Sequence, residues 1–383
     1  MIDPLIKQLE SASLIVTAGC GGVGKTTVAA ALALRAAGLG RRVAVLTIDP
    51  AKRLAQALGL TELNHELKRV PTDEKASGEL WAMMLDTKAA GDNMVLRFAQ
   101  DRKVARGILK NRYYGYFSTS LAGTLEYMAV EQVRVLMDEH DFDLVVLDTP
   151  PAAHALDFFD APDRLVDGLM KIPLNAIDGT NKKSISSRLA SQGRQIVLRG
   201  LNRLTGGPFL DDLAEFLGQF RSILGALQDA GEQVRALLRA DGTSFFLVTA
   251  PSAPRIEDAI AFFGELERRQ LPVGGVIVNR VHQEILFDTN NAINGDLLAS
   301  AWEGAALKPK RESDYHQLLT RLTLTLSEHN QRAQQEAHIC ETLALRIQQP
   351  QFIAPRLNSG LTSQADLLEL ANEIQLYVSG TSP

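Results

Sequence analysis

Cysteine and long apolar stretches are scarce in this chain of 383 residues. Its two cysteines, Cys20 and Cys340, cannot build a disulfide framework or a four-cysteine metal site within one chain. No apolar run approaches the roughly 20 residues that cross a bilayer, and residues 1–12 lack the basic and apolar regions of a secretory signal. We therefore expect a cytoplasmic protein without an integral membrane segment.

An excess of basic residues is also missing, since the formal net charge is -5. This balance disfavours non-specific binding to nucleic acid or to anionic membranes, which select basic surfaces. We therefore expect no nucleic-acid partner. Hydrophobic residues make up 45% of the chain, which is enough for a substantial core.

Short apolar runs alternate with helix-forming segments along much of the chain. Apolar runs of this length are typical of parallel strands that are buried on both faces. Their alternation with helices predicts an α/β fold with a doubly wound, mostly parallel sheet. The candidate strands are residues 14–18, 42–49, 79–86, 142–148, 243–250 and 273–279, with 351–355 as a weaker candidate.

Two stretches that look helical interrupt this alternation. Residues 161–242 show no evident strand and have apolar residues at helical spacing, and residues 94–140 are also largely helical in pattern. We predict that these two insertions form a helical subdomain. The α/β core would then comprise residues 1–93, 141–160 and 243–383, with a long helix over 313–347.

A glycine-rich segment, TAGCGGVGKTT (17–27), follows the first predicted strand and precedes a predicted helix. Gly19, Gly24, Lys25 and Thr26 match the phosphate-loop pattern G-x-x-x-x-G-K-[ST]. The glycines let backbone amides turn towards phosphate oxygens, and the helix N-terminus adds partial positive charge. The lysine can reach the β- and γ-phosphates, and the threonine hydroxyl can bind Mg²⁺. The segment therefore predicts a site for a nucleotide with Mg²⁺.

Two aspartates end predicted strands. Asp148 stands where a Walker-B-type carboxylate holds Mg²⁺, directly or through water. Asp49 is followed by Pro50, which fits the start of a helix. A carboxylate at this position could orient or activate the attacking water, and it could equally cap the helix.

The segments CGGVGKTT, TIDPAKRLAQALGL, DTPPAAHALDFFDAP and VIVNRV, in this order and spacing, resemble those of the anion-transporting ATPase family. This family includes arsenical pump-driving ATPases and the ATPases that target tail-anchored membrane proteins. GELWAMMLD (78–86) and AGTLEYMA (122–129) resemble in particular a bacterial subgroup that lacks the signature lysine of the deviant Walker A loop. The resemblance implies a P-loop fold of the deviant Walker A class, hydrolysis of ATP with Mg²⁺, and dimer closure driven by nucleotide.

The resemblance also implies roles for single residues. Asp49 would activate the water, Lys25 would act on the phosphates, and Asp148 would serve the Mg²⁺ site together with Thr26 and Asp49. Asn279 would hydrogen-bond adenine, and the chain around Pro355 and Arg356 would wall the base. His154 matches a histidine of the second switch, although it fits a solvent-facing helix start equally well. The phosphate cradle would comprise Gly21, Gly22, Val23, Gly24, Lys25, Thr26 and Thr27.

The chain departs from the family in its cysteines and methionines. Arsenite sites cluster several cysteines, and the tail-anchored-protein ATPases often close a dimer around zinc with a C-x-x-C pair. Neither pattern occurs here, so we expect neither arsenite nor zinc. Client grooves in the family are rich in methionine, whereas only Met170 falls within 151–242. A protein client at the helical subdomain stays an open expectation.

The loop itself departs from the family at Cys20. Deviant loops carry a lysine at this position, and it reaches across the dimer to the partner's nucleotide. A cysteine is short, and its thiol carries no positive charge near pH 7. We therefore predict slow ATP hydrolysis by the isolated chain. A paralogue with lysine at this position could supply the missing positive charge in a heterodimer, or another basic residue of the chain could substitute for it. In the alternative, Cys20 only packs, and a homodimer works with backbone amides alone.

Other interpretations remain beside this one. Residues 181–203 are basic and could form an amphipathic helix that binds a membrane or an acidic partner, or that pairs with the acidic helix after it. The protein could be a nucleotide-sensing regulatory or client-binding module with little hydrolysis. A partition or septum-positioning ATPase is disfavoured because residues 365–383 contain no lysine or arginine. An iron–sulfur reductase is rejected, because it would need two cysteines near the switches and Cys340 lies far from any switch motif.

Overall fold

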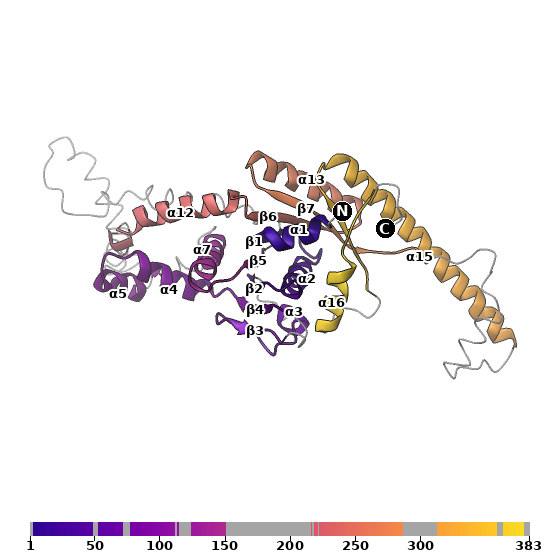
Figure 1. Cartoon of the computed structure of the whole chain (residues 1–383), viewed down its shortest axis with the longest axis horizontal. Coiled ribbons are helices and arrows are strands. Elements are labelled where there is room, and N and C mark those ends of the chain that lie inside the picture. Colours follow the sequence, from indigo (N-terminus) through magenta and orange to yellow (C-terminus); the bar gives the residue numbers. More distant parts are fainter. Residues whose placement is uncertain are drawn as a thin grey trace, which may run out of the picture.

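The computed structural model has one central sheet with helices on both faces (Figure 1). It describes residues 3–48, 53–71, 77–111, 113–114, 124–150, 216, 218–220, 222–285, 312–357 and 363–378. Predictions about Asp49, His154 and the basic segment 181–203 lie outside the described residues and stay predictions.

Nine strands form the described sheet, in the spatial order β3-β4-β2-β5-β1-β6-β7-β8-β9. All inner pairs are parallel, and only the edge strands β3 and β9 pair in the antiparallel sense. The mostly parallel sheet predicted from the apolar runs is thus confirmed, with all seven candidate strands in it. The strands are β1 (Leu14–Ala18), β2 (Arg42–Thr47), β3 (Lys68–Arg69), β4 (Glu79–Met84), β5 (Leu144–Asp148), β6 (Thr243–Thr249), β7 (Val273–Val281), β8 (Gln351–Pro355) and β9 (Gln375–Leu376).

The longest described helix is α15, which matches the helix predicted before the last strand and extends beyond the sheet in Figure 1. In the part of the chain that the structure describes, no helix combines the length and apolarity that crossing a membrane requires. The helices whose bounds lie within the described residues are α1 (Pro4–Ser11), α2 (Lys25–Gly38), α3 (Arg53–Ala57), α4 (Thr87–Phe98), α5 (Arg102–Lys110), α7 (Thr124–Glu139), α12 (Leu224–Arg239), α13 (Ala253–Arg268), α15 (Glu312–Arg346) and α16 (Gln364–Glu373).

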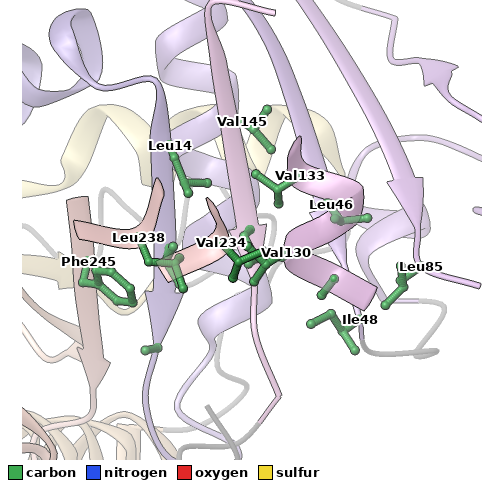
Figure 2. Packing of buried hydrophobic residues seen from close by; sticks show 14 of the residues in the cluster. Leu14, Leu46, Ile48, Leu85, Val130, Val133, Val145, Val234, Leu238 and Phe245 are labelled. Carbon is green, nitrogen blue, oxygen red and sulfur yellow. The ribbon is translucent and has the colours of Figure 1, made fainter. Parts of the chain in front are cut away.

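Two apolar cores lie on opposite sides of the sheet because successive residues of a strand point to opposite faces. Along β1, Leu14 and Val16 join one core, whereas Ile15 joins the other. Figure 2 shows Leu14 on the first side together with Val133 of α7 and Val234 of α12. The second core is built around the alanine-rich α2, whose small side chains let it lie close to the sheet and to α16.

Helix α4 contacts α5 and α7, and α7 also contacts α12. Of the strands, β5 contacts α7 and β6 contacts α12. Helix α4 begins at Thr87, before residue 94, where Asp86 caps it by accepting hydrogen bonds from the backbone amides of Lys88 and Ala89. The predicted division into core and helical subdomain stays a prediction, because residues 161–215 lie outside the described chain.

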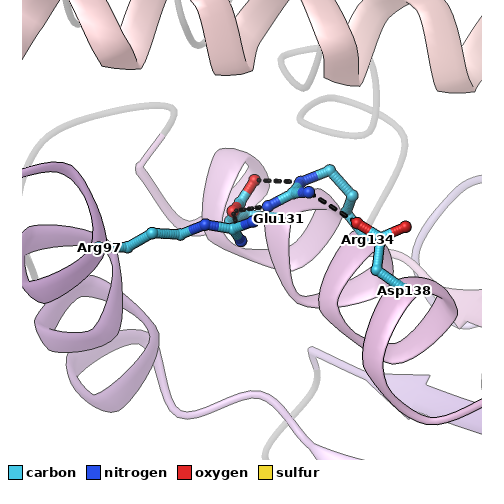
Figure 3. Close-up of polar contacts among 4 residues, drawn as sticks. All are labelled: Arg97, Glu131, Arg134 and Asp138. Atoms are coloured by element: carbon cyan, nitrogen blue, oxygen red, sulfur yellow. Dashed lines mark hydrogen bonds and ion pairs between the residues drawn. The ribbon is translucent and has the colours of Figure 1, made fainter.

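Glu131 of α7 is the buried centre of an ion-pair network (Figure 3). Arg134 donates to it from the same helix, with Nη2 2.8 Å from Oε1, and Arg97 of α4 donates over 3.0 Å. Arg134 is 15% exposed and Arg97 is 43% exposed. Arg134→Ala should therefore lower the free energy of unfolding by about 1.5–3 kcal/mol, because a buried carboxylate loses charge-assisted hydrogen bonds.

The matched variant Arg97→Ala should cost about 1 kcal/mol or less, since solvent screens the more exposed pair. Urea denaturation of both variants and of the unchanged chain measures the difference. Equal losses would contradict the claim that burial decides the strength of this network.

Candidate functional site

The site lies at the carboxyl ends of the central strands β1 and β5. Neighbouring strands there lead into helices on opposite faces: α2 follows β1 on one face, and α13 follows β6 on the other. Parallel sheets bind ligands in the crevice that such a reversal opens. The predicted residues that the structure describes are found at the ends of β1, β5, β7 and β8, along this same edge.

At two positions the loop needs glycine, because other groups lie too close for a Cβ atom. A Cβ on Gly19 would lie 2.1 Å from the backbone oxygen of Val248 in β6, so the loop must have glycine there. Gly24 has a φ of 94°, which favours glycine, and a Cβ on it would lie 2.3 Å from Nδ2 of Asn279. The loop is thus held between β6 and β7, with Gly21 and Gly22 exposed on its outer turn.

Lys25 opens helix α2 and bends back over the loop. Its Nζ donates to the backbone oxygen of Cys20 over 3.1 Å, and only 8% of the residue is exposed. No described side chain caps the start of α2, where Lys25, Thr26 and Thr27 form the first turn. Backbone amides in a first turn lack partners inside the helix, so this end of α2 and the ammonium group can both serve an anion.

Asp148 at the end of β5 is buried and receives two hydroxyl hydrogen bonds. Thr26 Oγ1 donates to its Oδ2 over 2.6 Å, and Thr47 Oγ1 of β2 donates to the same atom over 2.9 Å. A hydroxyl beside a carboxylate fits Mg²⁺, which prefers oxygen ligands and is often bound by one or two carboxylates plus substrate phosphates. The described residues hold no group of three or more His, Cys, Asp or Glu side chains that could bind a metal.

Thr47 was missed by sequence reasoning. Its contact depends on the parallel register that pairs Thr47 with Asp148, and strand register is a property of the folded sheet. The only signal in the sequence was a hydroxyl residue at the end of an apolar run, in TIDPA.

Cys20 is half-buried and contacts helix α13. Its Sγ donates to Oδ2 of Asp258 over 3.4 Å, and Arg255 Nη1 lies 3.6 Å from the same oxygen. Burial, followed by the hydrogen bond to Asp258, raises the pKa of the Cys20 thiol. The group is therefore a neutral thiol near pH 7, and it brings no positive charge to the loop.

Asn279 and the predicted base-walling residues lie on neighbouring strands. Asn279 is buried, and its Nδ2 donates to the backbone oxygen of Val23 over 2.9 Å, so in this structure it supports the loop. Pro355 is buried at the end of β8, and the exposed Arg356 donates from its backbone to Val281. The roles of Asn279, Pro355 and Arg356 towards a base stay predictions.

A buried carboxylate positions the side chain of Arg356 indirectly. Glu336 of α15 accepts a hydrogen bond from the backbone amide of His282, and its Oε1 lies 2.9 Å from the ring Nδ1. The other ring nitrogen, Nε2, lies 3.3 Å from Arg356 Nη1. No motif in the sequence predicts this link between α15 and the end of β8.

Comparisons with known proteins agree with this geometry. A sequence model described as "Anion-transporting ATPase" matches residues 12–296. "ATPase ASNA1 homolog 1" of Paramecium tetraurelia is 25% identical over 73% of this chain and 79% of its own length. "ATPase GET3A" of Arabidopsis thaliana is 26% identical, over 72% and 69% of the two chains. "ATPase BagA" of Mycobacterium tuberculosis is 23% identical, over 96% and 94%.

Proposed function

Because this chain belongs to the anion-transporting ATPase family, we propose that it binds ATP with Mg²⁺ and hydrolyses it at the carboxyl edge of the sheet. The observation that supports this most is that the phosphate loop and the predicted Mg²⁺-binding residues lie in direct contact. Lys25 arches over the loop, and Thr26 from the same helical turn is hydrogen-bonded to Asp148. Relatives of similar sequence are named ATPases.

In this proposal, each residue has a distinct task. The backbone of residues 21–27 and the ammonium group of Lys25 hold the phosphates. Thr26 and Asp148 hold Mg²⁺, which neutralises phosphate charge when it is bound. Asp49 orients or activates the attacking water. Asn279 binds adenine, with Pro355 and Arg356 beside the base.

We further propose that nucleotide brings two chains together and that closure acts on a partner or client through the helical subdomain. The pair is a homodimer or a heterodimer with a paralogue that has lysine in the loop. Cys20 supports slow hydrolysis by the isolated chain, because the neutral thiol cannot stabilise charge on a partner's nucleotide.

The same observation favours a second function, a nucleotide-sensing module that hydrolyses little and acts through its partner.

Phosphate release from ATP by the purified chain, with and without Mg²⁺, tests the proposal. Turnover that requires Mg²⁺ supports an ATPase, whereas tight ATP binding without measurable turnover supports the sensing module. A chain that neither binds nor hydrolyses ATP would refute both.

Asp148→Asn should raise the Mg²⁺ concentration needed for half-maximal turnover about 10- to 100-fold, the usual effect of losing an outer-shell partner of a metal. The amide keeps the size of the side chain and can still accept from Thr26 and Thr47, so the fold should persist. Asp86→Asn is a matched control, since it also follows a strand and asparagine caps α4 as well as aspartate does. The same Mg²⁺ dependence in both variants would exclude Asp148 from the metal site.

A further inference from the structure

Arg280 departs from the regular geometry of strand β7. Its φ is 66°, in the left-handed region that residues with a Cβ adopt at a cost in free energy. The pairing of β7 with β8 also shifts between Asn279 and Val281, so that Arg280 is the extra residue of a β-bulge. Bulges beside binding sites commonly redirect a side chain.

The apolar residues of β7 show what the bulge achieves. Val276 and Val278 join the core under α13, and Val281 joins the same core although a regular strand would place residue 280 there. The bulge therefore keeps Val281 buried and releases Arg280 from the alternation. Arg280 is exposed, and its Nη1 donates to the backbone oxygen of Gly22 over 3.1 Å.

The guanidinium group thus lies along the outer side of the phosphate loop. A Cβ on Gly24 would be 3.9 Å from Arg280 Nη2, so the group spans the segment from Gly22 to Gly24. Its position resembles that of Lys25, whose ammonium group also donates to a loop carbonyl oxygen. A carbonyl oxygen is a neutral acceptor, and a phosphate oxygen is a stronger acceptor for a guanidinium group.

We propose that Arg280 is a second phosphate-binding cation of this site and that it contacts the phosphate chain of the nucleotide from the same subunit. The guanidinium group has five donors in a planar fork, which suits a polyphosphate. It brings to the outer side of the loop a positive charge that Cys20 does not supply. This inference rests on the proposed function, because it requires that the loop holds a nucleotide.

Calorimetry with ATP and with inorganic tripolyphosphate, each with Mg²⁺, tests the assignment in the full chain. Arg280→Gly should raise the Kd for both ligands about 10- to 100-fold, as expected when a charge-assisted contact is lost. Tripolyphosphate has no base, so the loss of a contact between the neighbouring Asn279 and adenine would not mimic this result. The loss should shrink at high ionic strength, because salt screens an exposed contact between charges.

Gln270→Gly is the matched control. Gln270 has a φ of 57° in the turn after α13, so glycine relieves the same type of strain there without removing a charge. Both glycine variants should melt no lower than the unchanged chain, and Gln270→Gly should bind both ligands normally.

Three results would overturn the assignment. Arg280→Gly could bind both ligands as tightly as the unchanged chain does, or it could lose affinity for ATP alone, which would place Arg280 on the side of the base. A loss that does not depend on salt would mean that Arg280 only tethers Gly22. If the unchanged chain binds neither ligand, the proposed function fails as well, which distinguishes that case from the others.

Discussion

Lys25→Ala should abolish measurable ATP turnover and raise the Kd for ATP at least about a hundredfold. The structure places the ammonium group over the loop, 8% exposed and within 3.1 Å of the backbone oxygen of Cys20. Charge-assisted hydrogen bonds are worth about 1.5–3 kcal/mol each, and 1.4 kcal/mol corresponds to a factor of ten in affinity. A lysine that serves both the β- and the γ-phosphate makes at least two such contacts.

The fold should survive this change. Alanine is a strong helix former, and the first residue of α2 contributes no side-chain cap. Lys88→Ala provides a control, because Lys88 also lies in a first helical turn but is exposed and bonded to Asp92. Calorimetry with ATP and thermal unfolding of both variants separate a loss of binding from a loss of structure. An unchanged ATP affinity in Lys25→Ala would remove the basis of the proposed function.

Much of the fold follows from the pattern of apolar residues. Each inner strand contains an apolar run whose residues join the cores on both faces of the sheet, which is a strong local signal, and α15 begins and ends within one residue of its predicted bounds. The edge strands β3 and β9 escaped prediction because each has only two residues and pairs along one side. Two residues are too few for any periodicity.

The site was predictable only as far as its residues form a local motif. The glycines, Lys25 and Thr26 are neighbours in sequence, so their arrangement follows from one strand, one loop and one helix. The contacts of Thr47 with Asp148 and of Cys20 with Asp258 join elements that are 101 and 238 residues apart. Such contacts depend on strand register and helix placement, which no short pattern in the sequence encodes.

Cys20→Lys should raise kcat for ATP at least about a hundredfold and leave the Kd for ATP nearly unchanged. A positive charge supplied across a subunit interface to phosphoryl transfer is worth about 10³–10⁵ in rate. The present thiol is held neutral by burial and by Asp258, so it contributes none of this. Cys20 is only half-buried, which leaves room for a longer side chain to extend from the loop.

Asp258 is the main competitor for the introduced ammonium group, since its Oδ2 lies 3.4 Å from Cys20 Sγ. Its side chain is 50% exposed and already lies beside Arg255, so an ion pair there should be worth about 1 kcal/mol or less. That corresponds to about a fivefold loss in rate, which is small against the expected gain. The double variant Cys20→Lys with Asp258→Asn should therefore be faster than Cys20→Lys by a few-fold only.

Cys20→Ala separates the effect of charge from that of packing. A neutral thiol and a methyl group supply the same charge, so this variant should hydrolyse ATP as slowly as the unchanged chain. Steady-state turnover at saturating ATP, measured over a range of protein concentrations, compares all four proteins and reveals whether the gain requires a dimer. Fast turnover by the unchanged chain, equalled by Cys20→Ala, would show that backbone amides and Lys25 suffice, because the missing charge would then not limit the rate.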